Sequence, residues 1–438
     1  MNAFALIFLL MNLAALFLLP RRWTPLPILL GACYIPALQL IQLGPAHLSV
    51  MRALIAGGLV RIIMRNERLV GGLNSLDRLV MVWAVWMLVS SYFHKDQSAA
   101  LVYRLGLVYD AGGIYFLLRI LCTSLDDVVG LCRITAILLV PLAIEMLYEK
   151  VTLQNLFYEA VGDPIGLYIR NGTVRAQGPF AHAIIAGTVA ATTMPIIMVL
   201  WRQSRKEAIV GLGACLVIIF TCGSSGPIMS MASGFAALFM WRHRAQIPLV
   251  FWIMVASYVV LDLVMKEPAY YIMARIDLVG GSGGWHRARL IESAIEHLDE
   301  WWVAGTDYTR HWMPSGVSWS AEHTDITNHY LKMGVIGGLP LMLLFMGILM
   351  QGFSAVRWTV QAVSQRLSKH QFTCWALGAS LFAHATTFIS VSYFDQSFVF
   401  IYLTLAAIGS VYSNAPMKSR VRLSTSSLGD HALLIKRT

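Results

Sequence analysis

Residues 330–353 read YLKMGVIGGLPLMLLFMGILMQGF, an apolar run with a single charged side chain, Lys332. An α-helix needs about 20 apolar residues to cross the hydrocarbon core of a bilayer. Similar runs recur along the chain, at 2–20, 25–43, 78–93, 103–120, 128–147, 181–201, 207–222, 226–241, 247–265, 372–391 and 397–413. The run 46–64 is weaker because Arg52 and Arg61 interrupt it, and a re-entrant or interfacial helix is the alternative there. We therefore predict an all-α, polytopic membrane helix bundle with about 12–13 transmembrane helices and one large outer loop.

The composition indicates the same class of protein. Hydrophobic residues make up 57% of the chain and charged residues 13%, and the mean hydropathy is +0.65. A soluble domain carries about 25% charged residues, and the strands of a membrane β-barrel would be shorter and would alternate. None of the six cysteines forms a CxxC pair, so we expect neither a zinc site nor a disulfide framework from them.

The net charge of +10 comes mainly from short basic loops between the apolar runs. The positive-inside rule explains such loops, so we predict no nucleic-acid partner. The loops fall on one side, which we assign to the cytoplasm: Arg21/Arg22, Arg65/Arg68/Arg78, Arg202/Arg205/Lys206, Arg242/Arg244, Arg357/Arg366/Lys369 and the tail Lys418–Arg437. We divide the chain into N-terminal helices (1–147), central helices (148–265, with an outer segment at 148–180), an outer loop (266–329), C-terminal helices (330–413) and a cytoplasmic tail (414–438).

Cationic residues also occur on the predicted outer side, where the positive-inside rule does not require them. Among these, Arg287 follows the glycine-rich stretch Gly280–Gly284 and lies in the first turn of a predicted amphipathic helix, with Arg289 beside it. Backbone N–H groups at a helix start favour anions, and the planar fork of arginine suits phosphate. We predict an anionic ligand. The alternative is that these arginines contact lipid head groups or pair with nearby acidic residues, namely Asp277, Glu292 and Glu296.

Two further stretches carry candidate chemistry. In the segment 323–334, His323 is a candidate general base because an imidazole titrates near pH ~6.5, and Asp325 and His329 are four residues apart. A helix cap is the alternative for His323, and a metal bound by His323, Asp325 and His329 is disfavoured because the spacing is unlike that of zinc sites. The stretch from Arg175 to His182 enters another span through a Gly-Pro turn, with an interfacial anchor as the alternative.

Three motifs occur in order along the chain. The first, RAQGPF from Arg175 to Phe180, has the form Arg-x-x-Gly-x-Phe. The second, RARLIESA from Arg287 to Ala294, has the form Arg-x-x-Leu-(apolar)-x-x-Ala. In the third, His323 precedes GVIG, residues 334–337, by ten intervening residues. In these motifs, and in its many helices with one late outer loop, the chain resembles the O-antigen ligase / O-antigen polymerase family of bacterial inner-membrane proteins.

One departure from the family pattern concerns a helix turn. The family commonly has a Ser-Arg pair where this chain reads Ser224-Ser225-Gly226, and the resemblance implies that this arginine holds the lipid pyrophosphate. Its absence favours a divergent polymerase over a ligase. The alternative is that another arginine, such as Arg175, has the same role.

The resemblance implies a metal-independent glycosyltransferase, without a cofactor, on the periplasmic side of the bacterial inner membrane. Its donor would be an undecaprenyl-pyrophosphate-linked oligosaccharide, and membrane lipids, a flippase and a chain-length regulator would be its partners. His323 and Arg287 are the expected catalytic residues. The expected substrate-binding residues are Arg175, Arg289, Arg310, His182, Asp325 and His329. Two alternatives stay open: a ligase that transfers glycan to lipid A core, and a polytopic transporter or flippase without catalysis.

Overall fold

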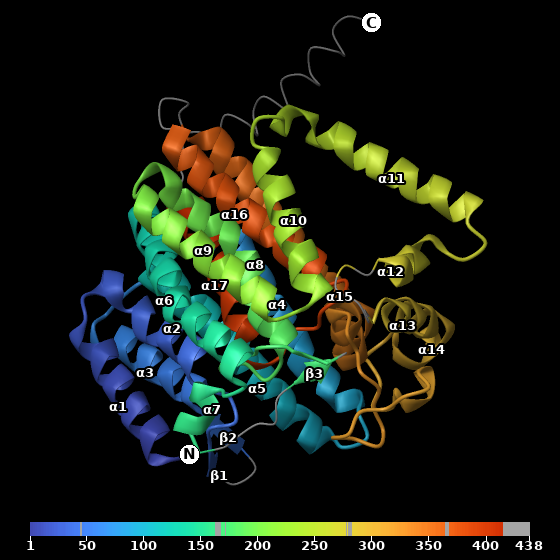
Figure 1. Ribbon diagram of the computed structural model, residues 1–438, viewed down its shortest axis with the longest axis horizontal. Helices are drawn as coiled ribbons and strands as arrows, with labels where there is room; N and C mark the ends of the chain where they lie inside the picture. Colours follow the sequence, from blue (N-terminus) through green and yellow to red (C-terminus); the bar gives the residue numbers. More distant parts are fainter. Residues whose placement is uncertain are drawn as a thin grey trace, which may run out of the picture.

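In the computed structural model the chain is an all-α helix bundle, as the sequence predicted (Figure 1). The structure describes residues 1–43, 46–162, 168–170, 172–276, 278, 283–363 and 368–414. The predicted tail after residue 414, Arg366, Asp277 and the residues Gly280, Gly281 and Ser282 lie outside these residues. The α-helices are α1 Ala3–Leu18, α2 Pro25–Tyr34, α3 Val50–Met64, α4 Ser75–Val89, α5 Gln97–Leu121, α6 Leu125–Thr152, α7 Leu156–Ala160, α8 Ala183–Ile197, α9 Arg205–Thr221, α10 Ser225–Phe239, α11 Ile247–Val264, α12 Ile272–Arg275, α13 Gly284–Glu296, α14 Leu298–Trp301, α15 His329–Ala362, α16 Ser368–Thr387 and α17 Phe398–Asn414.

Short elements join these helices. The 3₁₀ turns are η1 Arg21–Trp23, η2 Ser90–Phe93, η3 Met198–Arg202, η4 Arg244–Gln246, η5 Ala269–Tyr271, η6 Arg310–Trp312 and η8 Asp395–Ser397. Two antiparallel hairpins, β1 Leu40–Leu43 with β2 Ala46–Ser49 and β3 Ile169–Arg170 with β4 Thr173–Val174, lie at the lower end of the bundle in Figure 1. Side-chain caps explain several helix starts. Asn74 with Asp77 and Ser124 with Asp127 form capping boxes on α4 and α6.

Seven helices of the described part are long and apolar enough to cross a membrane, so the chain is a multi-pass membrane protein. They are Ser75–Phe93, Gln97–Leu121, Leu125–Thr152, Ala183–Arg202, Arg244–Val264, His329–Ala362 and Asp395–Asn414. The predicted spans 2–20, 207–222 and 226–241 form the shorter helices α1, α9 and α10, of 16, 17 and 15 residues, whereas 372–391 falls largely in the 20-residue helix α16. The predicted span 25–43 is wrong as one continuous helix, because α2 ends at Tyr34 and a strand follows it. The weak run 46–64 likewise divides into β2 and a 15-residue helix, α3.

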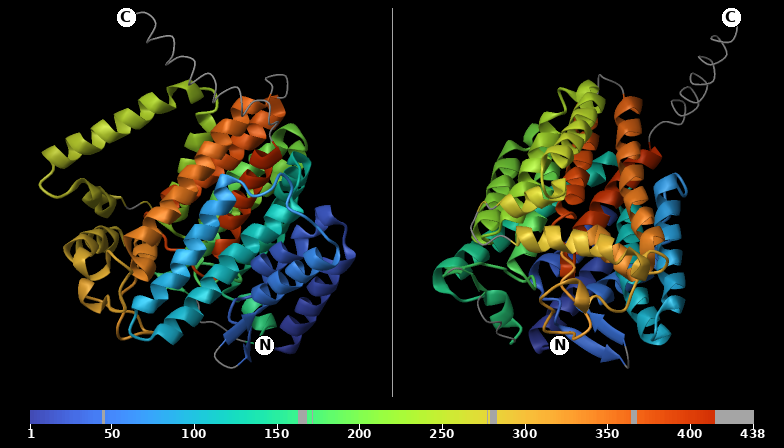
Figure 2. Two further views of the ribbon diagram at one scale, coloured as in Figure 1. Left: turned by 180° about the vertical axis from the view of Figure 1, so that it is seen from behind. Right: turned by 90° about the vertical axis from the view of Figure 1, so that its right-hand side faces the viewer.

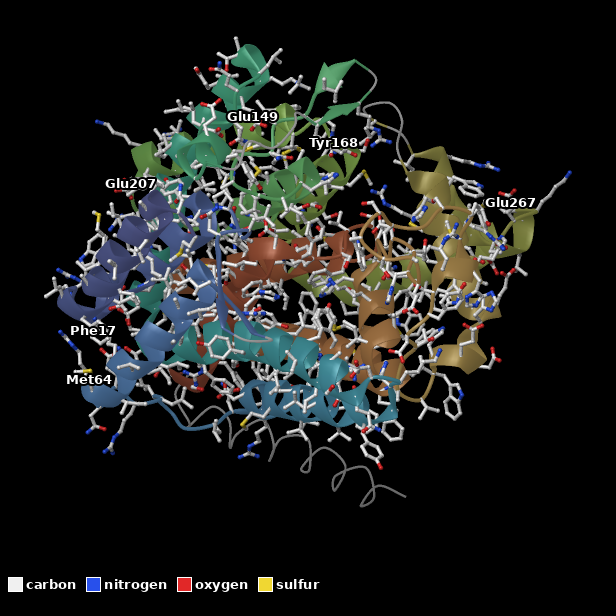
Figure 3. The ribbon with its side chains drawn as sticks, turned by 90° about the horizontal axis from the view of Figure 1, so that it is seen from below. Phe17, Met64, Glu149, Tyr168, Glu207 and Glu267 are labelled. Carbon is white, nitrogen blue, oxygen red and sulfur yellow. The ribbon has the colours of Figure 1, made fainter. Side chains whose placement is uncertain are left out.

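The two ends of the bundle differ in the way that the basic loops predicted. Figure 3 shows Phe17, Met64 and Glu207, near the ends of α1 and α3 and the start of α9, on one side of the molecule. Glu267, where the outer loop begins, lies on the opposite side. The helix ends beside three of the basic loops are therefore separated in space from the start of the outer loop, and the assignment of these loops to the cytoplasm stays a prediction.

Helix α11 stands apart from the bundle in Figures 1 and 2, and none of its residues is buried. Its exposed side chains from Leu249 to Val264 are mostly apolar, and its one carboxylate, Asp262, accepts a hydrogen bond from the Ala269 N–H near the end of the helix. A helix that is hydrophobic all round requires an apolar environment, and in the bilayer lipid can supply it. Helix α11 therefore links the bundle to the outer loop as a lipid-facing span.

The outer loop docks onto a break in α15. Gly337 and Gly338 have non-helical backbone angles, and φ of Gly338 is +73°. At this break Leu339 N–H donates to the Trp302 carbonyl (2.8 Å), and Thr306 N–H donates to the Val335 carbonyl (2.9 Å). A Cβ at position 338 would collide with the Val303 backbone. The glycines therefore allow the loop backbone to approach the helix and form hydrogen bonds with it.

This docking predicts the effect of two alanine substitutions in one helix. Gly338→Ala should destabilise the protein by at least about 1–3 kcal/mol, because alanine rarely adopts this backbone conformation and its Cβ would collide with the Val303 backbone. Gly347→Ala should not destabilise it, because its Cβ would meet only the Leu79 side chain at 3.4 Å. Thermal unfolding in detergent, with proteolysis of the outer loop, measures both effects. Equal stability of the two variants would contradict the docking.

Candidate functional site

A cavity of about 1280 Å³ lies between the outer loop and the bundle end that faces it. Its walls come from α5, the β3 hairpin, the turns before α8 and α10, α13, the loop 306–327 and the start of α15. Five of the predicted site residues line it together: Arg175, His182, Arg287, His323 and Asp325. Segments far apart in sequence therefore meet at one place, which the motifs alone did not show.

The cavity carries an excess of positive charge. Among its described lining residues, five side chains are cationic and two are carboxylates: Arg104, Arg170, Arg175, Arg287 and Lys332 against Asp307 and Asp325. Burial, followed by repulsion from Arg170, lowers the pKa of the Arg287 guanidinium, and the carboxylate of Asp325 acts in the opposite direction. Burial likewise lowers the pKa of Arg175. An anion bound here would relieve both effects.

Four of the five cations of this cavity donate to carbonyl groups, and none of the five forms an ion pair with a carboxylate of a described residue. Arg287 Nε donates to the Ser390 carbonyl (2.9 Å), Arg175 Nε to the Cys222 carbonyl (3.1 Å), and Lys332 Nζ to the Tyr393 carbonyl (2.9 Å). Arg104 donates to the carbonyl of Ile336. A carbonyl oxygen satisfies an N–H group but leaves the positive charge uncompensated.

Arginines elsewhere in the bundle differ in this respect. Each of four pairs with a carboxylate: Arg52 with Asp110 (2.8 Å), Arg61 with Glu67 (3.1 Å), Arg119 with Asp77 (3.4 Å) and Arg133 with Glu207 (2.7 Å). None of the cavity-lining arginine and lysine side chains forms an ion pair with a described residue. Of the buried arginines, Arg61 and Arg119 are thus each paired with a carboxylate, whereas Arg104 and Arg175 of the cavity are not.

The turn that presents Arg175 is held by buried polar groups. Glu149, near the end of α6, accepts hydrogen bonds from the N–H groups of Gln177 (3.0 Å) and Gly178 (2.9 Å). Asn155 Nδ2 donates to the Gly178 carbonyl (2.8 Å). Gly178 has φ of +58°, a conformation that favours glycine. This explains the glycine of the first motif, since the turn brings Arg175 inward.

The side chain of Arg175 lies at the turn between α9 and α10, where the family pattern has its arginine. It donates to the Ser224 hydroxyl as well as to the Cys222 carbonyl, and its guanidinium lies 5.0 Å from the centre of the Tyr168 ring. An arginine from a different segment therefore reaches the position that Ser225 and Gly226 leave without one.

His323 lines the cavity with one ring nitrogen engaged. Its Nδ1 forms a hydrogen bond with the Ser320 hydroxyl (2.8 Å), and Nε2 makes no hydrogen bond to any described residue. Trp319, which is 75% exposed, lies beside this ring at 5.7 Å between centres and also lines the cavity. When Nδ1 donates its proton to Ser320, Nε2 can accept one from a ligand.

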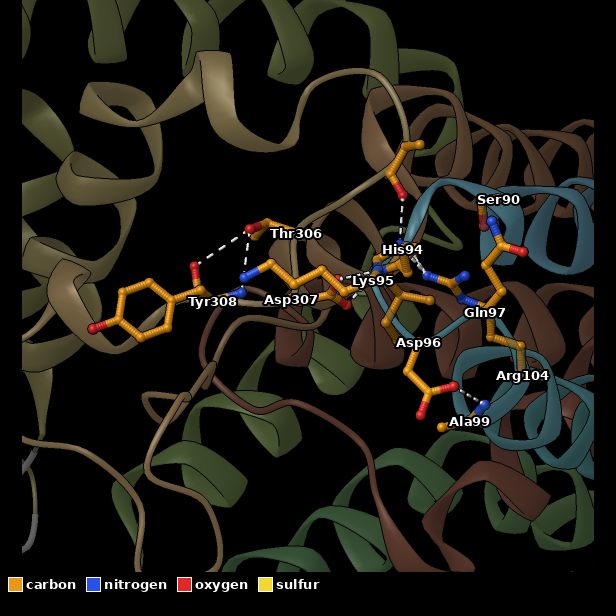
Figure 4. A network of polar contacts seen from close by, with 12 residues as sticks. Ser90, His94, Lys95, Asp96, Gln97, Ala99, Arg104, Thr306, Asp307 and Tyr308 are labelled. Carbon is orange, nitrogen blue, oxygen red and sulfur yellow. Dashed lines mark hydrogen bonds and ion pairs between the residues drawn. The ribbon is translucent and has the colours of Figure 1, made fainter.

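Sequence reasoning missed the wall opposite these residues. His94 Nδ1 contacts Asp307 Oδ1 (2.5 Å), and Arg104 contacts His94 Nε2 (2.5 Å), as Figure 4 shows. The Lys95 N–H donates to Asp307 Oδ2 (2.9 Å). Arg104 is 2% exposed, and its Nη1 has no hydrogen-bond partner among the described groups. Its place in an apolar helix was the available signal, because ionisable residues in a span are functional candidates.

Three predicted site residues lie away from the cavity. Arg289 faces the other side of α13, where it pairs with Glu292 (2.5 Å) and Glu296 (3.2 Å), so the alternative of acidic partners applies to it. Arg310 donates to the carbonyls of Met313 (2.7 Å) and Pro314 (3.1 Å).

His329 is buried, and its ring stacks on Phe388 (4.7 Å between centres). Its Nδ1 accepts a hydrogen bond from the Tyr393 N–H (3.1 Å). His323, Asp325 and His329 do not form a metal-binding group in the described part of the chain. Arg289, Arg310 and His329 are therefore not retained as substrate contacts.

The comparison with known proteins adds no relative. No protein-family model matches the chain, and no curated protein matches it. The resemblance to the ligase and polymerase family thus rests on the three motifs and stays a prediction.

The geometry around His182 predicts a pH effect on stability. Burial, followed by the charges of Arg175 and Arg170, lowers the pKa of His182 from 6.5 to about 4. The unfolded chain therefore takes up this proton first as pH falls, and the stability that neutral His182 contributes is lost between pH 6.5 and about 4. The melting temperature should therefore decrease more from about pH 7 to about pH 5 in the wild type than in His182→Asn.

Asparagine is the suitable replacement because it keeps an acceptor for the Ile184 N–H, which His182 Nδ1 now caps at 3.1 Å. Equal pH sensitivity of the two proteins would show that His182 does not titrate in this way.

Proposed function

We propose that this protein is a polysaccharide polymerase-type glycosyltransferase that joins undecaprenyl-pyrophosphate-linked repeat units at the periplasmic face of the bacterial inner membrane. One observation carries the proposal: a single cavity on the outer-loop side holds uncompensated cations together with His323. The pyrophosphate of such a donor is a strong anion next to a lipid, and it suits cationic groups at a membrane surface.

The proposed reaction places each group in a role. The hydroxyl oxygen of the acceptor sugar attacks the anomeric carbon of the donor, and the bond from that carbon to the pyrophosphate oxygen breaks. The electron pair leaves with the lipid pyrophosphate, whose growing charge Arg287 and Arg175 stabilise. The proton of the hydroxyl passes to Nε2 of His323, while Nδ1 donates to Ser320. The exposed indole of Trp319 supplies a face on which a sugar ring can stack.

The position of Arg175 bears on the missing Ser-Arg pair, whose absence favours a divergent polymerase over a ligase, or another arginine in the same role. Its guanidinium contacts Ser224 at the same turn, so the chain retains a cation there. A ligase that uses lipid A core as acceptor would need the same donor site, and it remains the second candidate on that ground.

A transporter without catalysis fits the charge distribution less well. Transporters carry substrate-binding charges near the midplane of the membrane, commonly at broken helices. Here the buried cations with carboxylate partners are distributed through the bundle, and the uncompensated ones gather at its outer end. This arrangement favours binding and reaction at the surface.

The proposal predicts the result of three substitutions. Arg287→Ala and His323→Ala should each reduce polymer formation by at least about 10²–10³-fold, because each removes a group acting in the transition state. Arg289→Ala should retain polymer, since Arg289 lies on the same helix but pairs outside the cavity. Gel analysis of a deletion strain complemented with each variant measures the product, and immunoblotting of membranes controls for protein level.

The form of the residual product separates the candidates. Single repeat units should accumulate if the protein is a polymerase, whereas long polymer on its lipid carrier would identify a ligase. Normal polymer in both Arg287→Ala and His323→Ala would refute the mechanism. Turnover of lipid-linked glycan by purified protein without an ion gradient would exclude a transporter.

A further inference from the structure

The outer loop holds a second cluster of ionisable side chains, apart from the cavity. His297 Nδ1 and His311 Nε2 each lie 2.9 Å from Oε1 of Glu300. All three ligand atoms lie within 4.8 Å of one another. None of these residues lines the cavity that holds Arg287 and His323, so the proposed reaction does not use them.

The fold of the loop, not a sequence motif, brings the cluster together. His297 lies at the break between α13 and α14, and Glu300 follows in α14. His311 comes from the 3₁₀ turn η6, after the loop has returned from its docking site on α15. The spacing H-x₂-E-x₁₀-H matches none of the short zinc motifs, so no local pattern in the sequence indicated the cluster.

Neighbouring rings and one hydrogen bond fix the orientation of the cluster. The Tyr308 ring stacks on His311 (5.0 Å, 9°), and the His297 ring is parallel to Trp312 (6.1 Å, 3°). Trp312 Nε1 donates to Oε2 of Glu300 (3.1 Å), so that Oε1 points to the two imidazoles. Such bonds to the second atom of a ligand are typical of metal sites, where they orient the first shell.

The geometry points to a site for a zinc-like divalent ion. We propose that His297, Glu300 and His311 bind such an ion and that it stabilises the fold of the outer loop. Two imidazole nitrogens and one carboxylate oxygen are a ligand set that zinc prefers, with a fourth position for water. Tetrahedral ligands at about 2.0–2.1 Å from zinc lie roughly 3.3 Å apart. The two nitrogen–oxygen separations of 2.9 Å would widen slightly to reach this value, and the two ring nitrogens lie within 4.8 Å of each other.

The loop has a physical need for such a link. Its buried apolar cluster in the described part consists of Leu290, Ala294, Trp301, Trp312 and Met313. Small cores are commonly supplemented by a metal or another cross-link, and a bound ion would add to the stability that the loop gains from its docking on α15. The proposed ion would join His297 and α14 to η6, beside Trp312, and so stabilise the loop that carries Arg287 and His323.

Metal binding by the full-length protein tests the inference. Protein without a polyhistidine tag, in detergent and stripped with a chelator, is titrated with Co²⁺ and Zn²⁺, following Co²⁺ absorption and bound metal. We expect about one tetrahedral Co²⁺ per chain, displaced by Zn²⁺. His311→Ala and Glu300→Gln should each weaken binding by at least about 10-fold. His243→Ala, an exposed histidine outside the loop, should bind as the wild type does.

A second readout covers the case in which His311→Ala fails to fold. Zinc should slow proteolysis within residues 297–322 of the wild type and should not protect Glu300→Gln, whose side chain keeps its shape. Absence of stoichiometric binding in the wild type, or binding unchanged in both ligand variants, would overturn the inference. Neither result depends on polymer formation, so the metal site and the proposed function are tested independently of each other.

Discussion

The docking of the outer loop onto the broken helix α15 is the constraint on which the site depends. The backbone bonds from Leu339 to Trp302 and from Thr306 to Val335 close the break on both sides of Gly337 and Gly338. Gly334 has the same function one turn earlier, because a Cβ there would meet the Trp301 ring at 2.5 Å. The glycines of the third motif are therefore contact points for a loop, and the helix accepts the break because the loop satisfies its backbone groups.

The docking also determines the shape of the cavity. Asp307 follows Thr306, the last residue of the loop that docks on α15. Its carboxylate contacts His94 and the Lys95 N–H, which lie just before α5. Arg104, in α5, donates to the Ile336 carbonyl next to the break. The same few peptide groups thus close the loop over the bundle and orient the opposite wall. A shift of the loop would separate Arg287 from Arg175, since they come from different segments.

Much of this organisation could be predicted from the sequence, and the reasons for the failures are physical. Apolar runs of sufficient length predicted the bundle, and the ends of α1 and α3 and the start of α9, each beside a basic loop, lie on one side of the molecule. Arg175, Arg287 and His323 were predicted because each adjoins a turn or helix start at a membrane boundary. The contact of His94 with Asp307 joins residues 213 positions apart, and only the fold could show it.

The predicted site residues that lie outside the cavity show what a local sequence pattern can and cannot predict. Arg289 was predicted from its charge, but Glu292 and Glu296 lie on the same helix face and neutralise it. That pairing was readable from the i, i+3 spacing. His329 could not be assigned in this way. Four residues after Asp325 it is already inside the bundle, where burial and aromatic packing replace contact with water. Position relative to the membrane boundary therefore decides the role of an ionisable residue here more strongly than its neighbours in sequence do.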